Sequence, residues 1–396
     1  MATAVIGVLA DDLTGAAEIG GVAWRYGLSA EVQIAWCQST AQVLILDTDS
    51  RSLAPSVAAE SVRGAAISLR ERGHLFKKVD SVLRGPVLAE LIMLLQVTGR
   101  GRVLLVPSNP GRGRTIQGGR SYIHGIPINQ TEFAHDPEHP ILTADVRELL
   151  GNAGEWPVSV LRRGDALPSK GIIIAEASTS ADLFYWAGQV DENTLPAGAA
   201  EFFAVWLMKL NASAPVMSSP TDSPQRVLIV SGSASTARHE FYRRCEAEGV
   251  PVLRMPLAVF ADPLAESKAQ VRWEAEIRRA LKIFPQVILT IDQSVHPAPN
   301  WPKHLRLSLA AAATHVLTES PVDQLYVEGG ATARALVDCL GWTRLRVFRE
   351  FVPGIVAVLP YRLTTPLLIL KPGSYSWPAT VGNLFAELGT QPRSAM

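Results

Sequence analysis

Short, continuous apolar runs alternate along the chain with longer segments in which apolar residues recur at helical spacing. Such runs are typical of strands buried on both faces of a parallel sheet, and the longer segments are typical of the helices that cover it. The predicted strands are residues 5–9, 43–46, 75–79, 103–106, 171–175, 227–230, 287–291, 325–327 and 367–370. Helices are predicted from about residue 14 and over residues 56–70, 180–189 and 270–283. The alternation predicts an α/β fold.

Polar residues follow four successive predicted strands in the first half of the chain, directly where each strand ends. They are Asp11-Asp12, Asp47-Thr48-Asp49, Asp80-Ser81 and Ser108-Asn109. Parallel sheets bind ligands beyond the carboxyl ends of their strands. One such residue is an ordinary helix cap, but four in succession predict a polar binding site.

A linker divides the chain. Its 396 residues exceed what one hydrophobic core usually serves. Residues 212–224, ASAPVMSSPTDSP, are rich in Ser, Pro and Ala and lack periodicity. We therefore predict two domains, residues 1–211 and 225–396, each a mainly parallel sheet with helices on both faces.

Charge and cysteine content argue against a nucleic-acid partner, a cysteine metal site and a disulfide framework. Lys+Arg and Asp+Glu both number 37, so no basic excess exists to neutralise a nucleic acid. The three cysteines, Cys37, Cys245 and Cys339, show neither metal spacing nor a disulfide framework, and we expect all three to be buried. The apolar N-terminus lacks a preceding positive segment and a cleavage pattern, and no apolar run reaches membrane-spanning length. We expect a cytoplasmic protein without a nucleic-acid or membrane partner.

The segment LADDLTGAA, residues 9–17, places two carboxylates between a strand and a helix. A carboxylate at such a strand end can accept a proton from a substrate hydroxyl. Neighbouring side chains on an extended chain point to opposite sides, so we expect Asp11 and Asp12 to diverge. One can cap the helix while the other reaches the substrate. We assign the reaching role to Asp12 and keep Asp11 as the alternative.

Two further stretches of the first half carry basic residues. Arg84 follows Asp80-Ser81, and its planar guanidinium can grip a carboxylate with two hydrogen bonds. Lys77 and Lys78 alternate across a strand, so at least one should lie on the surface. Residues 107–137 form a long Gly- and Arg-rich stretch that we predict to be a functional loop. Its arginines, Arg112, Arg114 and Arg120, could hold an acidic substrate.

No metal site is predicted. The histidines of this region, His124, His135 and His139, lack convincing metal-ligand spacing. We interpret them as ordinary polar residues.

Three strand-end turns of the second half could hold phosphate. Residues 227–241 and 325–336 each read as strand, small-residue turn and helix, and Lys371 ends another strand in LILKPGS. Backbone N–H groups of such turns can cradle phosphates. Neither turn is a Walker A loop or a full dinucleotide fingerprint. Each alone is common packing, but together they predict phosphate binding.

These segments resemble the four-carbon acid sugar kinase family, which phosphorylates acids such as threonate, erythronate and 3-oxo-tetronates. The family's Ala-Asp-Asp-Leu-Thr-Gly-Ala stands at residues 10–16, and its Lys-Lys-x-Asp-Ser-x-Leu-Arg-Gly at residues 77–85. Its Gly-Arg-Thr loop stands at residues 113–115, and its Thr-x-Phe-x-x-Asp-Pro run at residues 131–137. The likeness covers nearly the whole chain in the same order.

The resemblance implies that the N-terminal domain holds a sugar acid and that the C-terminal domain holds ATP with Mg²⁺. The implied acid-site residues, for substrate binding or proton transfer, are Asp11, Asp12, Asp47, Arg51, Lys77, Asp80, Ser81, Arg84, Gly113, Arg114 and Thr115. The implied nucleotide-site residues are Ser231, Gly232, Ser233, Ser235, Gly329, Gly330, Ala331, Thr332, Lys371 and Gly373.

Phosphoryl transfer asks mainly for positioning and charge neutralisation. We expect Arg84 and N–H groups of residues 113–125 to hold the acid's carboxylate while Asp12 accepts the hydroxyl proton. We also expect domain closure to exclude water and suppress ATP hydrolysis.

Two departures from the family pattern lie in the second half. Ala331 stands where the family has an acidic residue, and residues 374–378 replace its Gly- or Asn-Phe-Gly run. These departures leave open an acid-binding protein whose ATP site has decayed. An isomerase or dehydrogenase of a small acid is a further alternative, although the Gly-x-Gly-x-x-Gly turn of a dehydrogenase is missing. The sequence also leaves open the exact acid, the phosphorylated hydroxyl and assembly into a homo-oligomer.

Overall fold

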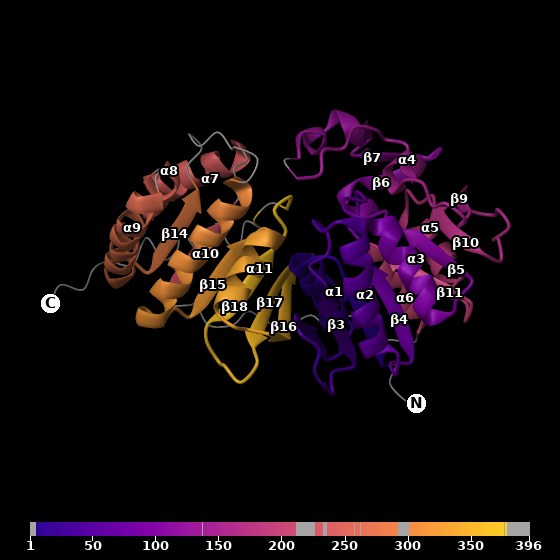
Figure 1. Ribbon diagram of the computed structural model, residues 1–396, viewed down its shortest axis with the longest axis horizontal. Helices are drawn as coiled ribbons and strands as arrows, with labels where there is room; N and C mark the ends of the chain where they lie inside the picture. The colour runs from indigo at the N-terminus through magenta and orange to yellow at the C-terminus, as the bar shows by residue number, and fades with distance from the viewer. Residues whose placement is uncertain are drawn as a thin grey trace. The chain divides into compact units, whose positions relative to one another are not determined.

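The structure is a computed structural model that describes residues 5–136, 138–210, 226–232, 236–256, 258–261, 263–291, 301–375 and 377. The chain divides into two compact units, Met1–Met217 and Ser218–Met396, which are shown in Figure 1. The predicted linker, residues 212–224, lies outside the described residues. Each unit is built around its own parallel strands.

The N-terminal unit contains strands in the order β2-β3-β1-β4-β11-β5-β10-β9, and these strands pair in parallel. The strands are β1 Ile6–Ala10, β2 Ala30–Gln33, β3 Val43–Asp47, β4 His74–Lys78, β5 Arg102–Val106, β9 Val158–Leu161, β10 Gly171–Ala175 and β11 Thr194–Gly198. Because the strands are covered on both faces, they read as continuous apolar runs.

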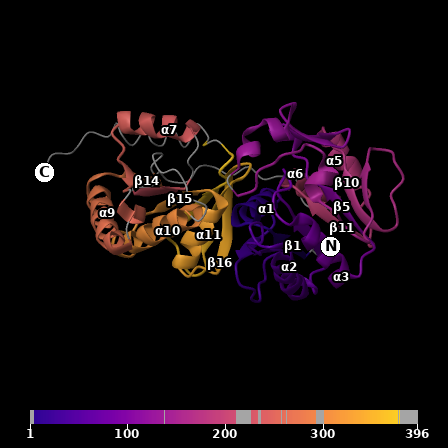
Figure 2. The ribbon, with the colours of Figure 1, turned by 45° about the horizontal axis from the view of Figure 1, so that its top comes forward.

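Helices cover both faces of this sheet. They are α1 Leu13–Arg25, α2 Pro55–Leu69, α3 Val87–Thr98, α4 Val146–Leu150, α5 Ser180–Ala187 and α6 Ala200–Lys209. Helix α6 packs against α1 and α5, and α2 packs against α3 (Figure 1, Figure 2). The core beneath α2 and α3 includes Leu9, Val62 and Leu91.

The stretch 107–137, which we predicted to be a loop, contains a small antiparallel sheet and three 3₁₀ turns. The sheet is β6 Arg114–Gln117, β7 Arg120–Ile123 and β8 Ile126–Pro127, and the turns are η1 Pro110–Arg112, η2 Ile128–Gln130 and η3 Glu132–His135. Gly118 and Gly119 take φ of 57° and 72° at the hairpin turn, a conformation that favours glycine. Ile128, Phe133 and Ile141 form a satellite core with Val82. These strands are too short to give a periodic signal.

The C-terminal unit has the strand order β13-β14-β12-β15-β18-β17-β16. The pairs from β13 to β18 are parallel, whereas β17 is antiparallel to β18 and β16. The strands are β12 Val227–Ser231, β13 Val252–Met255, β14 Gln286–Ile291, β15 Gln324–Glu328, β16 Arg344–Val352, β17 Ile355–Pro360 and β18 Leu367–Lys371. The helices are α7 Thr236–Ala247, α8 Ala258–Ala261, α9 Pro263–Ile283, α10 Trp301–Glu319 and α11 Gly330–Cys339.

The predicted fold class is confirmed, and the predicted strands lie within the observed ones to about one residue. The largest boundary difference is α9, which begins at Pro263 and not at Gln270. We did not predict the β16–β17 hairpin, in which charged and apolar residues alternate only over the first four residues of β16.

The cysteine prediction is wrong in part. Cys245 is buried, but Cys37 is half-buried and Cys339 is exposed, and all three are free thiols. Burial raises the pKa of the Cys245 thiol to about 11.

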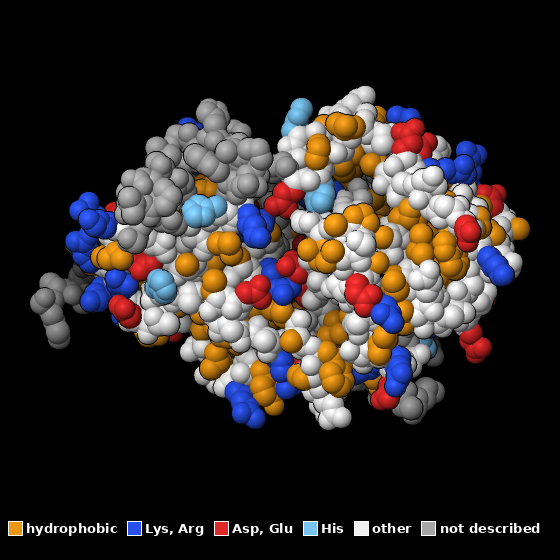
Figure 3. All heavy atoms as spheres, viewed as in Figure 1, with side chains coloured by type: hydrophobic (Ala, Val, Ile, Leu, Met, Phe, Trp, Pro, Cys, Tyr) orange, Lys and Arg blue, Asp and Glu red, His pale blue; other side chains and the backbone are white. Residues whose placement is uncertain are grey.

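None of the helices in the described part of the chain is long and apolar enough to cross a membrane. Lys and Arg side chains are interspersed with Asp and Glu on the face shown in Figure 3, in keeping with the balanced composition.

Candidate functional site

The strand ends of the N-terminal unit are level with one another. Ala10 of β1 pairs with both Asp47 of β3 and Lys78 of β4. Lys78 pairs with Gly198 of β11, and Gly198 pairs with Val106 of β5. The residues that follow these positions therefore lie along one edge of the sheet, where α/β proteins bind their ligands.

Arg51 joins the two carboxylates that follow β1. The backbone N–H groups of Ser50 and Arg51 donate to the carbonyl of Asp11 at 3.0 and 3.2 Å, which brings the β3–α2 loop against the end of β1. The Arg51 side chain then donates from Nε to Asp11 Oδ2 at 2.7 Å and from one terminal nitrogen to Asp12 Oδ2 at 3.0 Å. The carboxylates converge on one guanidinium, so our expectation that they diverge is wrong. The long Arg51 side chain reaches both.

Asp12 is the N-cap of α1. Its Oδ1 accepts the backbone N–H of Gly15 at 2.8 Å and lies 2.9 Å from Arg51 Nη2. Its Oδ2 accepts from the Thr14 hydroxyl at 2.7 Å as well as from Arg51. A carboxylate has about four acceptor positions, and these contacts occupy all of them.

Asp11 is bound less completely. Its Oδ2 accepts from Arg51, but its buried Oδ1 has no hydrogen-bond partner among the described residues. Burial raises the pKa of this carboxyl, but Arg51, Lys77 and Lys78 outweigh it and hold the pKa below its usual value. Asp11 is therefore a carboxylate with free acceptor capacity at the strand end.

Both lysines of β4 are buried, which overturns our expectation that one lies on the surface. Lys77 Nζ lies 2.9 Å from Glu90 Oε2 of α3, and Glu90 Oε1 accepts from Ser50. Lys78 Nζ donates to the carbonyl of Val79 at 2.8 Å and lies 3.8 Å from Glu18 of α1. The two alternate across the strand as expected, but helices cover both faces of this sheet.

Asp80 and Arg84 form a bidentate pair after β4. Arg84 donates from Nε and Nη2 to Asp80 at 2.8 and 3.1 Å, and from Nη1 to Asp136 at 2.8 Å. Burial raises the pKa of Asp80, but Arg84 and Arg51 lower it much further, to well below its usual range. Burial lowers the pKa of Arg84, and Asp80 raises it to well above its usual range.

The loop after β5 brings a third arginine to this edge. Arg114 donates to the hydroxyl of Ser81, and the guanidiniums of Arg84 and Arg114 lie 5.2 and 5.6 Å from the Phe133 ring centre. Gly113 has φ of 66°, and a Cβ there would lie 2.3 Å from His124 Nδ1. A glycine is therefore required at this turn.

The remaining predicted residues of this unit lie at or near the same edge. Thr115 is half-buried in β6, and buried Asp47 accepts the N–H of Asp49 at 3.0 Å. Arg112 is half-buried, whereas Arg120 is exposed. In the part of the chain that the structure describes, no group of three or more His, Cys, Asp or Glu side chains is placed to hold a metal ion.

The ion pair at Asp80 predicts how stability depends on pH. The pKa of Asp80 is lower in the folded protein than in the unfolded chain, so its contribution is complete above about pH 5 and is lost as the pH falls. We expect Asp80→Asn to lower the free energy of unfolding at pH 7 and to flatten its decrease between about pH 5 and pH 2. Denaturant titrations across this range provide the measurement, with exposed Glu155→Gln as control. A wild-type slope in Asp80→Asn would contradict the assignment.

The three predicted turns of the C-terminal unit lie together, because β12, β15 and β18 are neighbours. A Cβ at Gly232 would lie 2.2 Å from Thr332 Oγ1, and one at Gly373 would lie 3.9 Å from the Cα of Gly329. Gly329 has φ of 95° and begins α11 without a side-chain cap among the described residues. The first N–H groups of α11, from Gly330 onward, therefore lie beside glycines, which have no side chains to block a ligand. Backbone N–H groups at such a helix start can bind a phosphate.

Glu328 joins the buried ends of the three strands. It accepts from the Ser231 hydroxyl at 3.2 Å and from Lys371 Nζ at 3.2 Å, and the side chains of Glu328 and Lys371 are 0% exposed. Lys371 also donates to the carbonyls of Pro372 and Tyr375. In this structure Lys371 therefore braces the β18 turn from inside.

Two residues of the altered stretch, Tyr375 and Trp377, lie against Lys371. Nζ of Lys371 lies 5.0 Å from the ring centre of Trp377, which meets Tyr326 edge to face. Ala331 is exposed in the first turn of α11, and Thr332 is buried. Predicted residues Ser233 and Ser235 lie outside the described residues.

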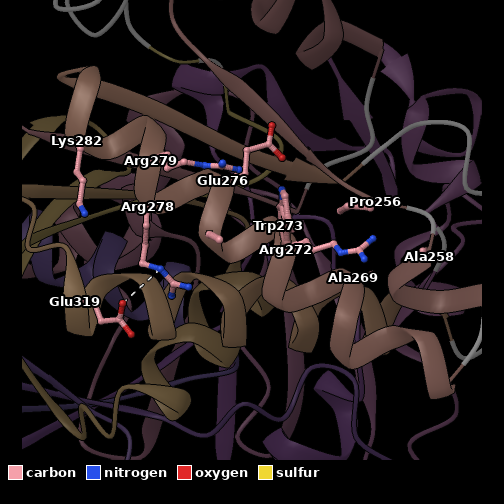
Figure 4. A pocket seen from close by; sticks show the side chains of 11 residues that line it. Pro256, Ala258, Ala269, Arg272, Trp273, Glu276, Arg278, Arg279, Lys282 and Glu319 are labelled. Atoms are coloured by element: carbon pink, nitrogen blue, oxygen red, sulfur yellow. Dashed lines mark ion pairs between the residues drawn. The ribbon is translucent and has the colours of Figure 1, made fainter.

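A groove of about 700 Å³ is lined mainly by residues of α9 (Figure 4). Its basic side chains include Arg272, Arg279 and Lys282, and Arg278 pairs with Glu319 at 3.4 Å. These are side chains of the outer face of a helix, and none of the predicted nucleotide-site residues contributes to the lining.

Several polar residues at these edges are not among the individually predicted site residues. They are Glu90, Asp136 and Glu328, together with Ser108 and Asn109, which were predicted only as part of the row of polar strand ends. Ser108 and Asn109 directly follow a predicted strand, and Glu328 ends another directly before Gly-Gly. The sequence pattern around these three residues could therefore have identified them as site residues. Glu90 gave no such signal, because its partner Lys77 lies on another element. Asp136 belongs to the Thr-x-Phe-x-x-Asp-Pro run, but its pairing with Arg84 could not be predicted, because the two residues are 52 positions apart.

Comparisons with known proteins agree with both units. The sugar-binding N-terminal domain family matches residues 6–202, and the nucleotide-binding C-terminal domain family matches residues 228–375. The D-threonate kinase of Bordetella bronchiseptica is 30% identical over 306 residues, 71% of each chain. That of Salmonella typhimurium is 25% identical over 386 residues, 88% of this chain and 89% of its own.

A third relative bears a different substrate name. The 3-oxo-tetronate kinase of Methylobacterium radiotolerans is 25% identical over 412 residues, 93% of this chain and 96% of its own. A crystal structure of a Salmonella typhimurium protein shares the fold, with a TM-score of 0.75, 17% identity and coverage of 96% and 98%. The matches span both domains in order, and the chain therefore belongs to the four-carbon acid sugar kinase family, which joins a sugar-binding N-terminal domain to a nucleotide-binding C-terminal domain.

Proposed function

We propose that this protein is a kinase that transfers a phosphoryl group from ATP to a hydroxyl group of a four-carbon sugar acid, such as threonate, erythronate or a 3-oxo-tetronate. The N-terminal domain, residues 1–211, binds the acid, and the C-terminal domain, residues 225–396, binds the nucleotide. Residues 212–224 link them. The names of the relatives support the reaction class, and two sets of converging strand ends support the division of labour.

One observation carries the acid site. Three arginines, Arg51, Arg84 and Arg114, and three aspartates, Asp11, Asp12 and Asp80, meet at one sheet edge with alternating charge. Arginine guanidiniums bind carboxylates, and the three bonds that Arg84 makes leave two of its five N–H groups for a ligand. The aspartates fix the guanidiniums in place and prevent the arginines from repelling one another.

We assign the proton acceptor to Asp11, the alternative in our sequence analysis. All four acceptor positions of Asp12 are occupied, whereas Asp11 Oδ1 has no partner in the described structure. A general base needs an available lone pair, and its carboxylate must be ionised. The cationic groups around Asp11, which lower its pKa, keep it in that form at neutral pH.

The turns of the C-terminal domain fit a nucleotide phosphate. The α11 N-terminus is uncapped within the described residues, and Gly232, Gly329 and Gly373 add no side chains beside it, so N–H groups are available at these turns. Mg²⁺ would neutralise charge on the phosphates and would be held mainly by them and by water. Glu328 is engaged by Ser231 and Lys371, so we assign it to bracing the turns.

Turnover of a panel of four-carbon acids, with and without ATP and Mg²⁺, tests the function. We expect ATP-dependent formation of a phosphorylated acid and ADP. Acid binding without ATP consumption would instead indicate a binding protein with a decayed nucleotide site. Conversion of an acid without ATP would indicate a different enzyme class.

Gly232→Ala tests the nucleotide site. The new methyl group would lie 2.2 Å from Thr332 Oγ1, so the turn must move away from α11. We expect the Kd for ATP to rise at least about 10-fold while the Kd for the acid is unchanged. Calorimetric titration measures both.

A second substitution controls for general damage to the fold. Thr332→Ala removes the clashing hydroxyl, so adding it to Gly232→Ala should restore part of the ATP affinity. An unchanged Kd for ATP in Gly232→Ala would place the nucleotide elsewhere.

A further inference from the structure

Unsatisfied polar atoms gather at one edge of the N-terminal sheet. Among the described residues, three buried atoms that follow β1 and β5 have no hydrogen-bond partner: Asp11 Oδ1, Ser108 Oγ and Asn109 Oδ1. Native proteins pair almost all of their buried polar groups, so each such atom requires an explanation. Asp11 belongs to the site already described, whereas Ser108 and Asn109 have no role there.

Ser108 and Asn109 lie beside the beginning of α6. Val106 pairs with Gly198, and the N–H of Ala199 donates to the Val106 carbonyl at 3.1 Å. The chain after β5 therefore runs next to the first residues of α6. The N-cap of this ten-residue helix is Ala199, which has no side-chain oxygen to cap it. The first N–H groups of α6 therefore lack a side-chain cap. They lie next to the chain segment that carries Ser108 and Asn109.

The same two residues connect to the acid site. The N–H of Asn109 donates to the carbonyl of Arg114 at 2.8 Å, and the N–H of Arg114 donates to the backbone carbonyl of Asn109 at 3.1 Å. The Arg114 side chain donates to Ser81. Ser108 and Asn109 therefore extend the polar edge from β4 toward β5.

The chemistry of these atoms selects their partner. Ser108 is 1% exposed and Asn109 is 2% exposed, so bulk water does not satisfy them. An amide oxygen only accepts hydrogen bonds, so the partner of Asn109 Oδ1 must be a donor. A carboxylate cannot donate, whereas a hydroxyl can both donate to Asn109 and accept from Ser108 or from the N–H groups of α6.

We propose that Ser108 and Asn109 bind hydroxyl groups of the sugar acid, at the β5 end of the polar edge, and so determine which acid is accepted. This inference rests on the proposed function. A site built to bond a hydroxyl rejects an analogue that lacks it, because its buried polar groups are then left unpaired. Ser108 and Asn109 therefore favour acids that carry hydroxyl groups over deoxy analogues.

The test compares D-threonate with its 2-deoxy and 3-deoxy analogues in wild type, Ser108→Ala and Asn109→Ala. We expect each variant to lose at least about 10-fold in kcat/KM for D-threonate and much less for one deoxy analogue, with the KM for ATP unchanged. Thr314→Val is the matched control, because Thr314 Oγ1 on α10 is another buried hydroxyl without a partner among the described residues. It should leave the preference among acids unchanged.

The melting temperature of the ligand-free protein separates this role from a structural one. Removing an unsatisfied hydroxyl should not lower it, so Ser108→Ala should melt at or above the wild-type temperature while its D-threonate-induced shift shrinks. A lower melting temperature with wild-type preference among the acids would show that a buried water is the partner, and would overturn the proposal. If wild type phosphorylates none of the acids, the proposed function fails, and the acid-induced shifts still decide this inference: equal shifts in wild type and both variants overturn it.

Discussion

Asp11→Asn is expected to lower turnover roughly 10²–10⁴-fold, the usual contribution of a general base. The substitution keeps the shape of the side chain and removes the carboxylate whose Oδ1 has no partner in the described structure. Because Arg51 can still donate to the amide oxygen, the acid's Kd should change little. The melting temperature should fall, since the buried negative charge that Arg51, Lys77 and Lys78 stabilise is lost, so turnover is measured per folded molecule. Single-turnover kinetics with ATP and the preferred acid separate the chemical step from binding.

Asp12→Asn is the matched control for this experiment. Asparagine caps a helix about as well as aspartate does, so the bond from Gly15 persists and turnover per folded molecule should fall by less than about 10-fold. A large loss of turnover in Asp12→Asn and not in Asp11→Asn would show that Asp12, the residue that the sequence favoured, accepts the proton. Loss in neither variant would remove the aspartate pair from the chemistry.

Glu328→Gln is expected to destabilise the C-terminal domain by about 3–5 kcal/mol, because it removes the carboxylate charge that the buried ammonium of Lys371 contacts at 3.2 Å. The side chains of both residues are 0% exposed, so water cannot compensate. Denaturant unfolding followed by circular dichroism measures the change as a lower midpoint. The three turns that Glu328 and Lys371 join should lose ATP affinity in parallel.

Two further variants separate the buried charge from the loss of any ion pair. Adding Lys371→Met to Glu328→Gln removes the buried ammonium together with the carboxylate, so most of the lost stability should return. Glu246→Gln breaks the pair with Arg254 in the same domain, whose side chains are 36% and 35% exposed, and should change stability by less than about 1 kcal/mol. A loss in Glu328→Gln no larger than that in Glu246→Gln would show that the buried pair does not stabilise the turns.

The sequence by itself determined the fold class and the edges at which chemistry occurs. A parallel sheet covered on both faces demands continuous apolar strands, so residues 43–46 and 227–230 were recognisable as strands without any tertiary information. Each such strand must end where the chain turns into polar residues. Asp11, Asp80 and Gly329 could therefore be placed at strand ends from local pattern alone.

The tertiary structure decided which of these residues pair. Arg51 lies 40 residues from Asp11 in the sequence, and Lys371 lies 43 residues from Glu328. Lys77 of β4 pairs with Glu90 of α3. A pairing between distant residues depends on strand order and register, which leave no local trace in the sequence. For the same reason the sequence favoured Asp12 over Asp11 as the base, whereas the contacts of Arg51, Thr14 and Gly15 occupy Asp12 and leave Asp11 Oδ1 without a partner in the described structure.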